Sequence, residues 1–254
     1  MKTSPAIWIV RREAAKLGKF LARELGGELF PRSFAPTPTN RERFIQAFPT
    51  RQRWVLVMTT GIAMRYLDGL PKSKLADPAV VVVDEAARFA ISLLSGHEGG
   101  ANVLAYRVAA VTGATSVITT ATESLKPLVI GIGCRRGVSA KQINAAVQAA
   151  LKQASRPLSA VREIATIDLK AGEPGLVRWC RQHDLPLRIF SRQTVAGRPW
   201  VTQPSAWVKK NIGVDGVCEP CALLASHNGI LIHPKTAFAG VTVAIVEEPR
   251  PWIA

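Results

Sequence analysis

The chain contains 254 residues, 48% of them hydrophobic, and its 33 Lys and Arg against 18 Asp and Glu give a net charge of +15. A chain of this length and apolar content can bury a substantial core, in one large domain or two ordinary ones, so extensive disorder is not expected. Its apolar runs fall short of the roughly 20 residues that span a bilayer, and the N-terminal run is too short for a signal peptide. We therefore expect a cytoplasmic protein with no membrane partner.

The excess positive charge indicates a polyanionic partner, either nucleic acid or a polycarboxylated small molecule. The basic residues occur in short, dispersed clusters, and no run of five or more is present. Aromatic residues make up 6% of the chain and do not alternate with the basic clusters as a base-stacking surface requires. We therefore do not expect nucleic acid as a partner. A generally basic surface without a specific role explains the charge equally well.

The first half of the chain alternates between strand and helix patterns. A short apolar strand is expected at residues 6–10, and residues 13–25 have apolar positions at helical spacing, ended by Gly26 and Gly27. A loop at residues 31–38 precedes a short helix that Thr39 or Asn40 can cap. The pattern then predicts strands at 54–58, 79–83, 89–94 and 116–118, a helical turn at 62–67, a loop at 70–78 and a helix at 100–111.

Residues 119–127 are polar and end in a proline, which predicts a hinge before a second series of strands and helices. In that series we expect strands at 128–133, 161–166, 187–190, 229–232 and 242–246, a loop at 195–204, and helices at 140–151 (capped by Ser139), 174–183, 205–211 and 220–226. The sequence thus predicts the α/β class. We expect two α/β domains, residues 1–125 and 126–254, with mostly parallel or mixed sheets covered by helices.

The most informative segment is SLLSGHEGGAN, residues 92–102. It places the imidazole of His97, the carboxylate of Glu98 and the hydroxyl of Ser95 between a strand end and a helix start, where open α/β sheets bind ligands. Its three glycines allow a ligand to approach the backbone closely. A lone loop histidine is more often structural, but this environment favours a functional role for His97. The other three histidines stand alone, so we expect no protein-bound metal.

Two motifs in the second half have competing interpretations. The segment GIGCRRG, residues 131–137, resembles a dinucleotide fingerprint, but its third glycine falls one residue late, and the acidic residue that the motif requires is missing. Its backbone N–H groups and two arginines suit a carboxylate ligand, and a tight turn with solvated arginines is an equally good interpretation. The C-x-x-C at residues 218–221 lacks the second pair or the thioredoxin-like context that zinc or redox chemistry needs.

Several segments together resemble one family. They are residues 60–65, 74–85, 91–102 and 113–123 in the first half, and 128–137, 165–176 and 213–224 in the second. The first group is similar to the N-terminal domain of CbiG, a cobalamin-biosynthesis protein of the anaerobic pathway. The second group is similar to the CbiG C-terminal domain, which CobE proteins share. The resemblance covers nearly the whole chain.

The resemblance implies a cobalt-precorrin-5A hydrolase. Such an enzyme opens the ring A δ-lactone of its substrate and releases a two-carbon fragment as acetaldehyde, giving cobalt-precorrin-5B. Its substrate is a polycarboxylated cobalt corrinoid, which gives the positive charge a small-molecule explanation. Because the cobalt arrives inside the substrate, the resemblance implies no cofactor and no metal held by the protein. It allows other enzymes of the cobalamin pathway as further partners.

Lactone opening needs a positioned water, a base and a stabiliser for the developing oxyanion. On this interpretation His97 transfers protons, with Glu85 or Glu219 as alternatives. The expected substrate-binding residues are strand-end glycines, hydroxyls and an amide that contact the ligand, and cations that bind its carboxylates. They are Gly61, Arg65, Lys74, Ser95, Gly96, Gly99, Gly100, Asn102, Thr119, Thr120, Gly133, Arg135 and Lys170.

The chain departs from the family pattern at three places: Glu98 replaces a usually apolar residue, Glu123 replaces a usual Asp, and residues 86–87 are alanines where a glycine is common. Many relatives also carry a central domain between the two halves, whereas this chain joins them almost directly. A non-catalytic protein that binds or carries corrinoid intermediates is therefore the alternative function.

Overall fold

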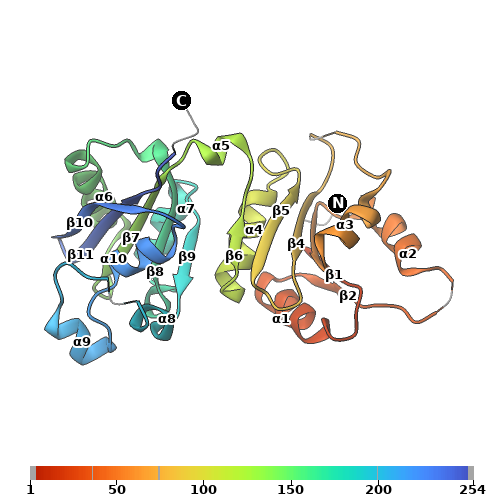
Figure 1. The fold of residues 1–254 in the computed structure, drawn as a ribbon, viewed down its shortest axis with the longest axis horizontal. Helices are drawn as coiled ribbons and strands as arrows, with labels where there is room; N and C mark the ends of the chain where they lie inside the picture. The colour runs from red at the N-terminus through yellow and green to blue at the C-terminus, as the bar shows by residue number, and fades with distance from the viewer. Residues whose placement is uncertain (1–3, 36, 74, 199, 251–254) are drawn as a thin grey trace. The chain divides into compact units, whose positions relative to one another are not determined.

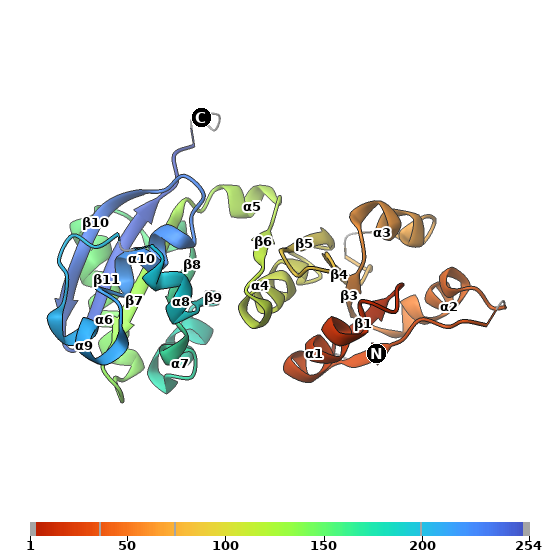
Figure 2. The same ribbon diagram turned by 60° about the horizontal axis from the view of Figure 1, so that its bottom comes forward.

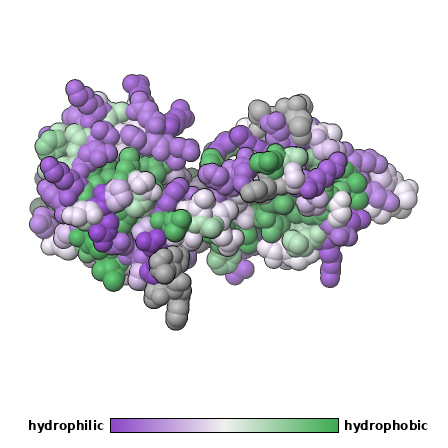
Figure 3. All heavy atoms as spheres, turned by 90° about the horizontal axis from the view of Figure 1, so that it is seen from above, coloured by the Kyte–Doolittle hydropathy of each residue, from purple (hydrophilic) through white to green (hydrophobic). Residues whose placement is uncertain are grey.

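The computed structural model describes residues 4–35, 37–73, 75–198 and 200–250. The chain divides into two compact units, Met1–Ala121 and Thr122–Ala254, each built on its own mixed β-sheet (Figure 1). Helices cover both faces of each sheet, which confirms the predicted α/β class. Within the described residues, every helix is too short or too polar to cross a membrane. On the face drawn in Figure 3, hydrophilic and hydrophobic side chains are interspersed in both units.

The sheet of the first unit has six strands in the order β2-β1-β3-β4-β5-β6. Its strands are β1 (Ala6–Ile9), β2 (Glu28–Phe30), β3 (Arg53–Val57), β4 (Ala79–Val83), β5 (Phe89–Leu94) and β6 (Thr115–Val117). The first four run parallel, β5 is antiparallel to β4, and β6 is parallel to β5. The carboxyl ends of β1, β3 and β4 therefore lie at one edge of the sheet, and those of β5 and β6 lie at the opposite edge.

Four helices cover this sheet: α1 (Ala15–Leu25), α2 (Asn40–Ala47), α3 (Thr60–Leu67) and α4 (Ala101–Thr112). Alternate residues of β1, β3 and β4 pack against α1 and α4 on one face and against α2 and α3 on the other. Figure 2 shows α1 and α4 on one side of the strands and α3 on the other. All five residues of β4 are buried because both of its faces are covered, as its continuous apolar sequence predicts.

The sheet of the second unit has five strands in the order β10-β11-β7-β8-β9. They are β7 (Leu128–Cys134), β8 (Val161–Ile167), β9 (Leu187–Phe190), β10 (Ile230–Phe238) and β11 (Val241–Glu247). The strands β7, β8 and β9 run parallel, whereas β11 is antiparallel to both β7 and β10. The carboxyl ends of β7, β8 and β9 therefore share one edge, which we call the β7 edge.

Two layers of helices enclose this second sheet. On one face are α6 (Ala140–Gln153) and α7 (Pro174–Gln182), and on the other are α8 (Arg192–Ala196), α9 (Ala206–Ile212) and α10 (Cys218–Leu224). The backbone of α10 lies directly against β7, because a Cβ at Gly131 would come within 1.8 Å of the Cys218 carbonyl oxygen. The predicted cap at Ser139 is confirmed: its hydroxyl accepts a hydrogen bond from the Gln142 N–H in a capping box.

Several elements differ from the sequence prediction. The strand β2 and the short helix α8 were not predicted, and the predicted hinge contains the four-residue helix α5 (Ala121–Ser124). Strand β10 runs six residues beyond its predicted end, past Pro234, because an edge strand with bulges tolerates a residue without an N–H group. Three short 3-10 helices complete the structure: η1 (Phe48–Thr50), η2 (Leu158–Ala160) and η3 (Asp168–Lys170).

Candidate functional site

The loop at residues 95–100 joins β5 to α4 through a tight turn. Ser95 has a left-handed φ of 55°, and its carbonyl oxygen accepts hydrogen bonds of 3.1 Å from the N–H groups of Gly99 and Ala101. A Cβ at Gly99 would lie 2.4 Å from the Ser95 Cβ, so a larger residue does not fit there. Gly100, at φ 83°, then starts α4. The glycines of the motif are therefore required by the path of the backbone.

A chain of side-chain hydrogen bonds lies beside this loop. The Ser92 hydroxyl donates to Asn102 Oδ1 (2.8 Å), and Asn102 Nδ2 donates to the Thr120 hydroxyl (2.9 Å). Gly96 fits closely against the same groups, because a Cβ there would come within 2.8 Å of both Thr120 and Asn102. The structure therefore gathers one set of the predicted residues, which we call the β5 edge: Ser95, Gly96, His97, Gly99, Gly100, Asn102, Thr119 and Thr120.

Two residues of the β5 edge are suited to contact a ligand in different ways. His97 is exposed on the loop, so its imidazole is accessible from solvent. Ser95 is buried, and among the described residues its hydroxyl finds no hydrogen-bond partner. Because an unpaired buried hydroxyl is unfavourable, this loop has hydrogen-bonding capacity that the described residues do not use.

The other predicted residues of the first unit do not lie at the β5 edge. Gly61 is in the first turn of α3, after β3, and Glu85 follows β4. Because β4 and β5 are antiparallel, Glu85 and His97 lie at opposite ends of this strand pair. The Glu85 carboxylate is 3.5 Å from Arg11 Nε, so it takes part in an ion pair there. Lys74, a predicted carboxylate-binding residue, lies outside the described residues.

Arg65 lines an open hollow of about 490 Å³ between α2 and α3, together with Arg41, Met64 and Asp68. The Arg41 guanidinium donates to the carbonyl oxygens of Arg65 (2.9 Å) and Asp68 (3.2 Å), which fixes it against α3. The Arg65 side chain is exposed at this hollow. It is therefore a surface cation of the first unit, placed on a different element from the β5 edge.

In the second unit, the predicted residues Gly133, Arg135 and Lys170 all lie at the β7 edge. Lys170 Nζ is 3.1 Å from the buried Glu173 carboxylate, whose other oxygen accepts a hydrogen bond from the Gly137 N–H (2.8 Å). The charge of Lys170 is thus balanced within the protein, and the pair connects the loop after β7 to the loop after β8. The Arg135 side chain is exposed, so it is the better placed of the two cations to meet a carboxylate ligand.

Glu219 is almost completely buried at the start of α10. One carboxylate oxygen accepts hydrogen bonds from the Thr202 hydroxyl (2.5 Å) and the Lys235 N–H (2.9 Å), and the other accepts one from the Thr202 N–H (2.8 Å). Both oxygens are therefore occupied by donors from the protein. In this environment Glu219 is better suited to hold the surrounding chain in place than to exchange protons with a ligand.

Cys134, Cys180, Cys218 and Cys221 are free thiols in the structure. Burial raises the pKa of Cys218 and of Cys134 to about 11 and raises the pKa of Cys221 further, so the C-x-x-C thiols are protonated at neutral pH. Among the described residues, no group of three or more His, Cys, Asp and Glu side chains is arranged to hold a metal ion.

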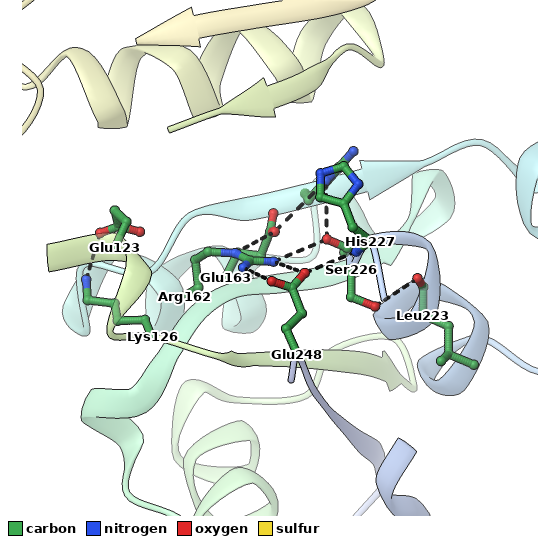
Figure 4. A network of polar contacts seen from close by, with 10 residues as sticks. Glu123, Lys126, Arg162, Glu163, Leu223, Ser226, His227 and Glu248 are labelled. Carbon is green, nitrogen blue, oxygen red and sulfur yellow. Dashed lines mark hydrogen bonds and ion pairs between the residues drawn. The ribbon is translucent and has the colours of Figure 1, made fainter. Parts of the chain in front are cut away.

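A partly buried ionic cluster that sequence reasoning missed lies at the amino end of β8 (Figure 4). Arg162 makes two hydrogen bonds to the Glu248 carboxylate, of 2.6 and 2.9 Å, and Glu248 also accepts one from the His227 N–H (3.1 Å). Next to Arg162, the Glu163 carboxylate is buried, and one of its oxygens has no partner among the described residues. The adjacent charged residues Arg162 and Glu163 within a strand of mostly apolar residues were the available signal for this cluster.

Comparison with known proteins agrees with this two-part organisation. The family model for the N-terminus of the cobalamin synthesis G protein matches residues 42–123, and the model for its C-terminus matches residues 128–246. Protein CobE from a Sinorhizobium species is 30% identical over 46% of this chain and 78% of the relative. The chain belongs to the CbiG family.

One relative is matched over nearly its full length. It is the cobalt-precorrin-5A hydrolase of Salmonella typhimurium, 26% identical over 331 aligned positions that include 90% of this chain and 94% of the relative. The alignment is longer than the chain itself, so the relative contains segments that this chain lacks. Among solved structures, a CobE from the cobalamin pathway covers 48% of this chain and 91% of its own, with 28% identity and a TM-score of 0.46.

Proposed function

We propose that this CbiG protein is a cobalt-precorrin-5A hydrolase. The observation that carries the proposal is the match to the Salmonella enzyme of that name, which extends over nearly all of both chains. The net charge of +15 supports it, because a positive field attracts a polycarboxylated corrinoid. In this proposal the cobalt ion is part of the substrate, and the protein provides the base, the hydrogen-bond donors and the cations.

The proposed reaction has two stages. Water adds to the carbonyl carbon of the ring A δ-lactone, and the acyl carbon–oxygen bond breaks to leave a carboxylate and a hydroxyl group. The hydroxyl then loses its proton, its carbon becomes the carbonyl of acetaldehyde, and the electrons of the broken carbon–carbon bond pass to the macrocycle. Both stages need a proton acceptor, and the first also needs donors that stabilise an oxyanion.

We place this chemistry at the β5 edge, with His97 as the proton-transfer residue. His97 is exposed on a loop whose backbone leads into the N-terminus of α4, and the neighbouring Ser95 hydroxyl has no hydrogen-bond partner in the part of the chain that the structure describes. A helix N-terminus and free donors favour a developing negative charge. The ion pair of Glu85 and the three hydrogen bonds to Glu219 make these two alternatives less suitable.

Acetaldehyde trapping with purified protein and cobalt-precorrin-5A tests the proposal. We expect the wild-type chain to release acetaldehyde, and His97→Ala to lose about 100-fold or more in rate, which is typical for removal of a general base. His227→Ala is a matched control, because His227 is an exposed histidine in the other unit. Equal rates for His97→Ala and the wild type would reject the proton-transfer role.

The alternative function is a protein that binds corrinoid intermediates without turning them over. The match of 46% of this chain to protein CobE, a name that states no activity, favours this alternative, as do the segments that the Salmonella relative has and this chain lacks. In the same trapping experiment, stable binding of cobalt-precorrin-5A without acetaldehyde release would select the carrier.

A further inference from the structure

Residues 200–217, here called the strap, connect α8 to α10 and include α9. Helix α8 follows the carboxyl end of β9, and α10 starts against β7, so the strap begins and ends close to the β7 edge. Figure 1 shows α8 and α9 at the end of this unit opposite to α5. The carboxyl ends of parallel strands are where open α/β sheets bind their ligands. The strap is therefore placed to contact a ligand at this edge.

The strap is held in place by hydrogen bonds and packing, including its first residues, 200–204, which the sequence predicts as a loop. Thr202 makes two hydrogen bonds to the buried Glu219 carboxylate, and Lys235 Nζ donates to the Gln203 carbonyl oxygen (2.6 Å). On α9, Val208 and Ile212 pack against the hydrophobic cluster below. Side chains that project from the strap are therefore presented on an ordered backbone, which reduces the entropy lost when a ligand binds.

Two tryptophans on the strap are exposed, unlike those of the cores. Trp207 is 68% exposed and Trp200 is 46% exposed, whereas Trp8, Trp54 and Trp179 are at most 1% exposed. Tryptophan has a large apolar ring that is usually well buried, so exposed tryptophans on an ordered segment indicate a surface that binds a partner. Their flat rings suit a ligand that is itself flat.

Positive charge accompanies these two rings. The Arg198 guanidinium lies 5.2 Å from the ring centre of Trp200, and Lys209 and Lys210 follow Trp207 on α9. Lys209 forms an ion pair of 3.0 Å with Asp215, whereas the exposed Lys210 has no ion pair among the described residues. The strap and the neighbouring Arg198 thus combine aromatic faces with cations that can bind carboxylates.

We propose that the strap binds a flat macrocycle that carries carboxylates at its rim. Trp207 and Trp200 stack on faces of the ring, and Arg198 and Lys210 pair with the acidic groups. The identity of the natural ligand, a polycarboxylated corrinoid, rests on the proposed function. Binding to the strap requires a planar ring, which matches the shape of the tryptophan rings, and acidic substituents, which match the charge of the cations.

Binding of uroporphyrin to the full-length protein tests this proposal, because uroporphyrin is a planar tetrapyrrole with acidic side chains around its rim. We expect Trp207→Ala to weaken binding about 10-fold, in line with the loss of one aromatic stacking contact, and Trp207→Phe to retain most of the affinity. Lys210→Glu should weaken binding and reduce its dependence on salt. Both residues are exposed, so the variants should fold, which their melting temperatures verify.

The matched control is Ile230→Ala, which removes an apolar side chain that is 63% exposed at the opposite end of the same sheet and should leave binding unchanged. Citrate, a polycarboxylate without a large ring, should not displace the porphyrin at equal carboxylate concentration. Wild-type affinity in both Trp207→Ala and Trp200→Ala would overturn the proposal. Displacement by a single-stranded oligonucleotide would also overturn it, because single strands bind to aromatic and basic side chains too. That result would identify the strap as a nucleic-acid surface.

Acetaldehyde release separates this proposal from the proposed function. If the wild type binds uroporphyrin through Trp207 but never releases acetaldehyde from cobalt-precorrin-5A, the hydrolase assignment fails and the strap proposal stands. If the wild type releases acetaldehyde and Trp207→Ala does so with unchanged KM, the strap proposal fails and the hydrolase assignment stands.

Discussion

Three glutamates of the second unit show how much the local environment decides the role of a carboxylate. Glu219 is buried but accepts three hydrogen bonds, so its charge is compensated. Burial raises the pKa of Glu163, and the nearby Arg188 and Arg162 oppose this increase without cancelling it. Burial acts on Glu248 too, but the hydrogen bonds and positive charge of Arg162, together with His227, jointly outweigh that effect and lower its pKa. One cluster therefore contains two acids whose pKa values move in opposite directions.

Replacement of Glu163 by glutamine should stabilise the protein at neutral pH. A carboxyl group whose pKa is raised by folding contributes most to the stability of the folded state below its ordinary pKa near 4.3. This contribution is lost as the pH rises through the raised pKa. Glu163→Gln should thus unfold at a higher urea concentration than the wild type at neutral pH, and the difference should disappear near pH 4. Identical pH profiles for the two proteins would contradict this assignment.

Glu248→Gln is the matched variant and should change stability in the opposite direction. The lowered pKa of Glu248 means that its carboxylate stabilises the fold above its ordinary pKa. We expect a loss of about 1–3 kcal/mol at neutral pH, the usual effect of breaking a charged hydrogen bond in a partly buried site. The loss should shrink as the pH falls through the lowered pKa of Glu248.

At the scale of elements, strand direction decides which polar residues meet. Hydrophobic periodicity located β4 and β5 almost to the residue, and it correctly placed polar segments at strand ends. Periodicity carries no information about direction, so it could not show that β5 reverses and separates Glu85 from His97. The four-residue α5 and the Pro234-containing part of β10 were missed for a related reason: local pattern is weak in short helices and in edge strands.

The β5–α4 turn should depend strongly on glycine at position 99. A Cβ there would come within 2.4 Å of the Ser95 Cβ and 2.9 Å of its carbonyl oxygen, so Gly99→Ala must shift the backbone. We expect a loss of about 1–3 kcal/mol, typical of overpacking, in urea unfolding. Gly61→Ala is the control, because nothing lies within 4 Å of its added methyl group and alanine favours the helix α3. Equal stability of the two variants would show that the turn can relax.

At the scale of the whole molecule, the hydrophobic core is divided in the same way as the chain. Two clusters draw their residues from positions 6–114, and the other two draw theirs from positions 128–246. The sequence predicted the α/β class because its apolar strands alternate with amphipathic helices in both halves. The order of the strap was less predictable. It depends on the hydrogen bonds of Thr202 and Lys235 to Glu219, and these residues are too far apart in sequence to form a local pattern.

Because each unit contains its own sheet and its own clusters, we expect each to fold when produced alone. Residues 122–254 should show cooperative urea unfolding and a circular dichroism spectrum with both helix and strand contributions. The match of the C-terminal family model to residues 128–246 lies entirely within this half, which supports the same expectation. Residues 1–121 should behave likewise, because β1, β3 and β4 are covered on both faces by helices of their own unit. If either half unfolds without cooperativity while the full chain unfolds in one transition, the two cores depend on each other for stability.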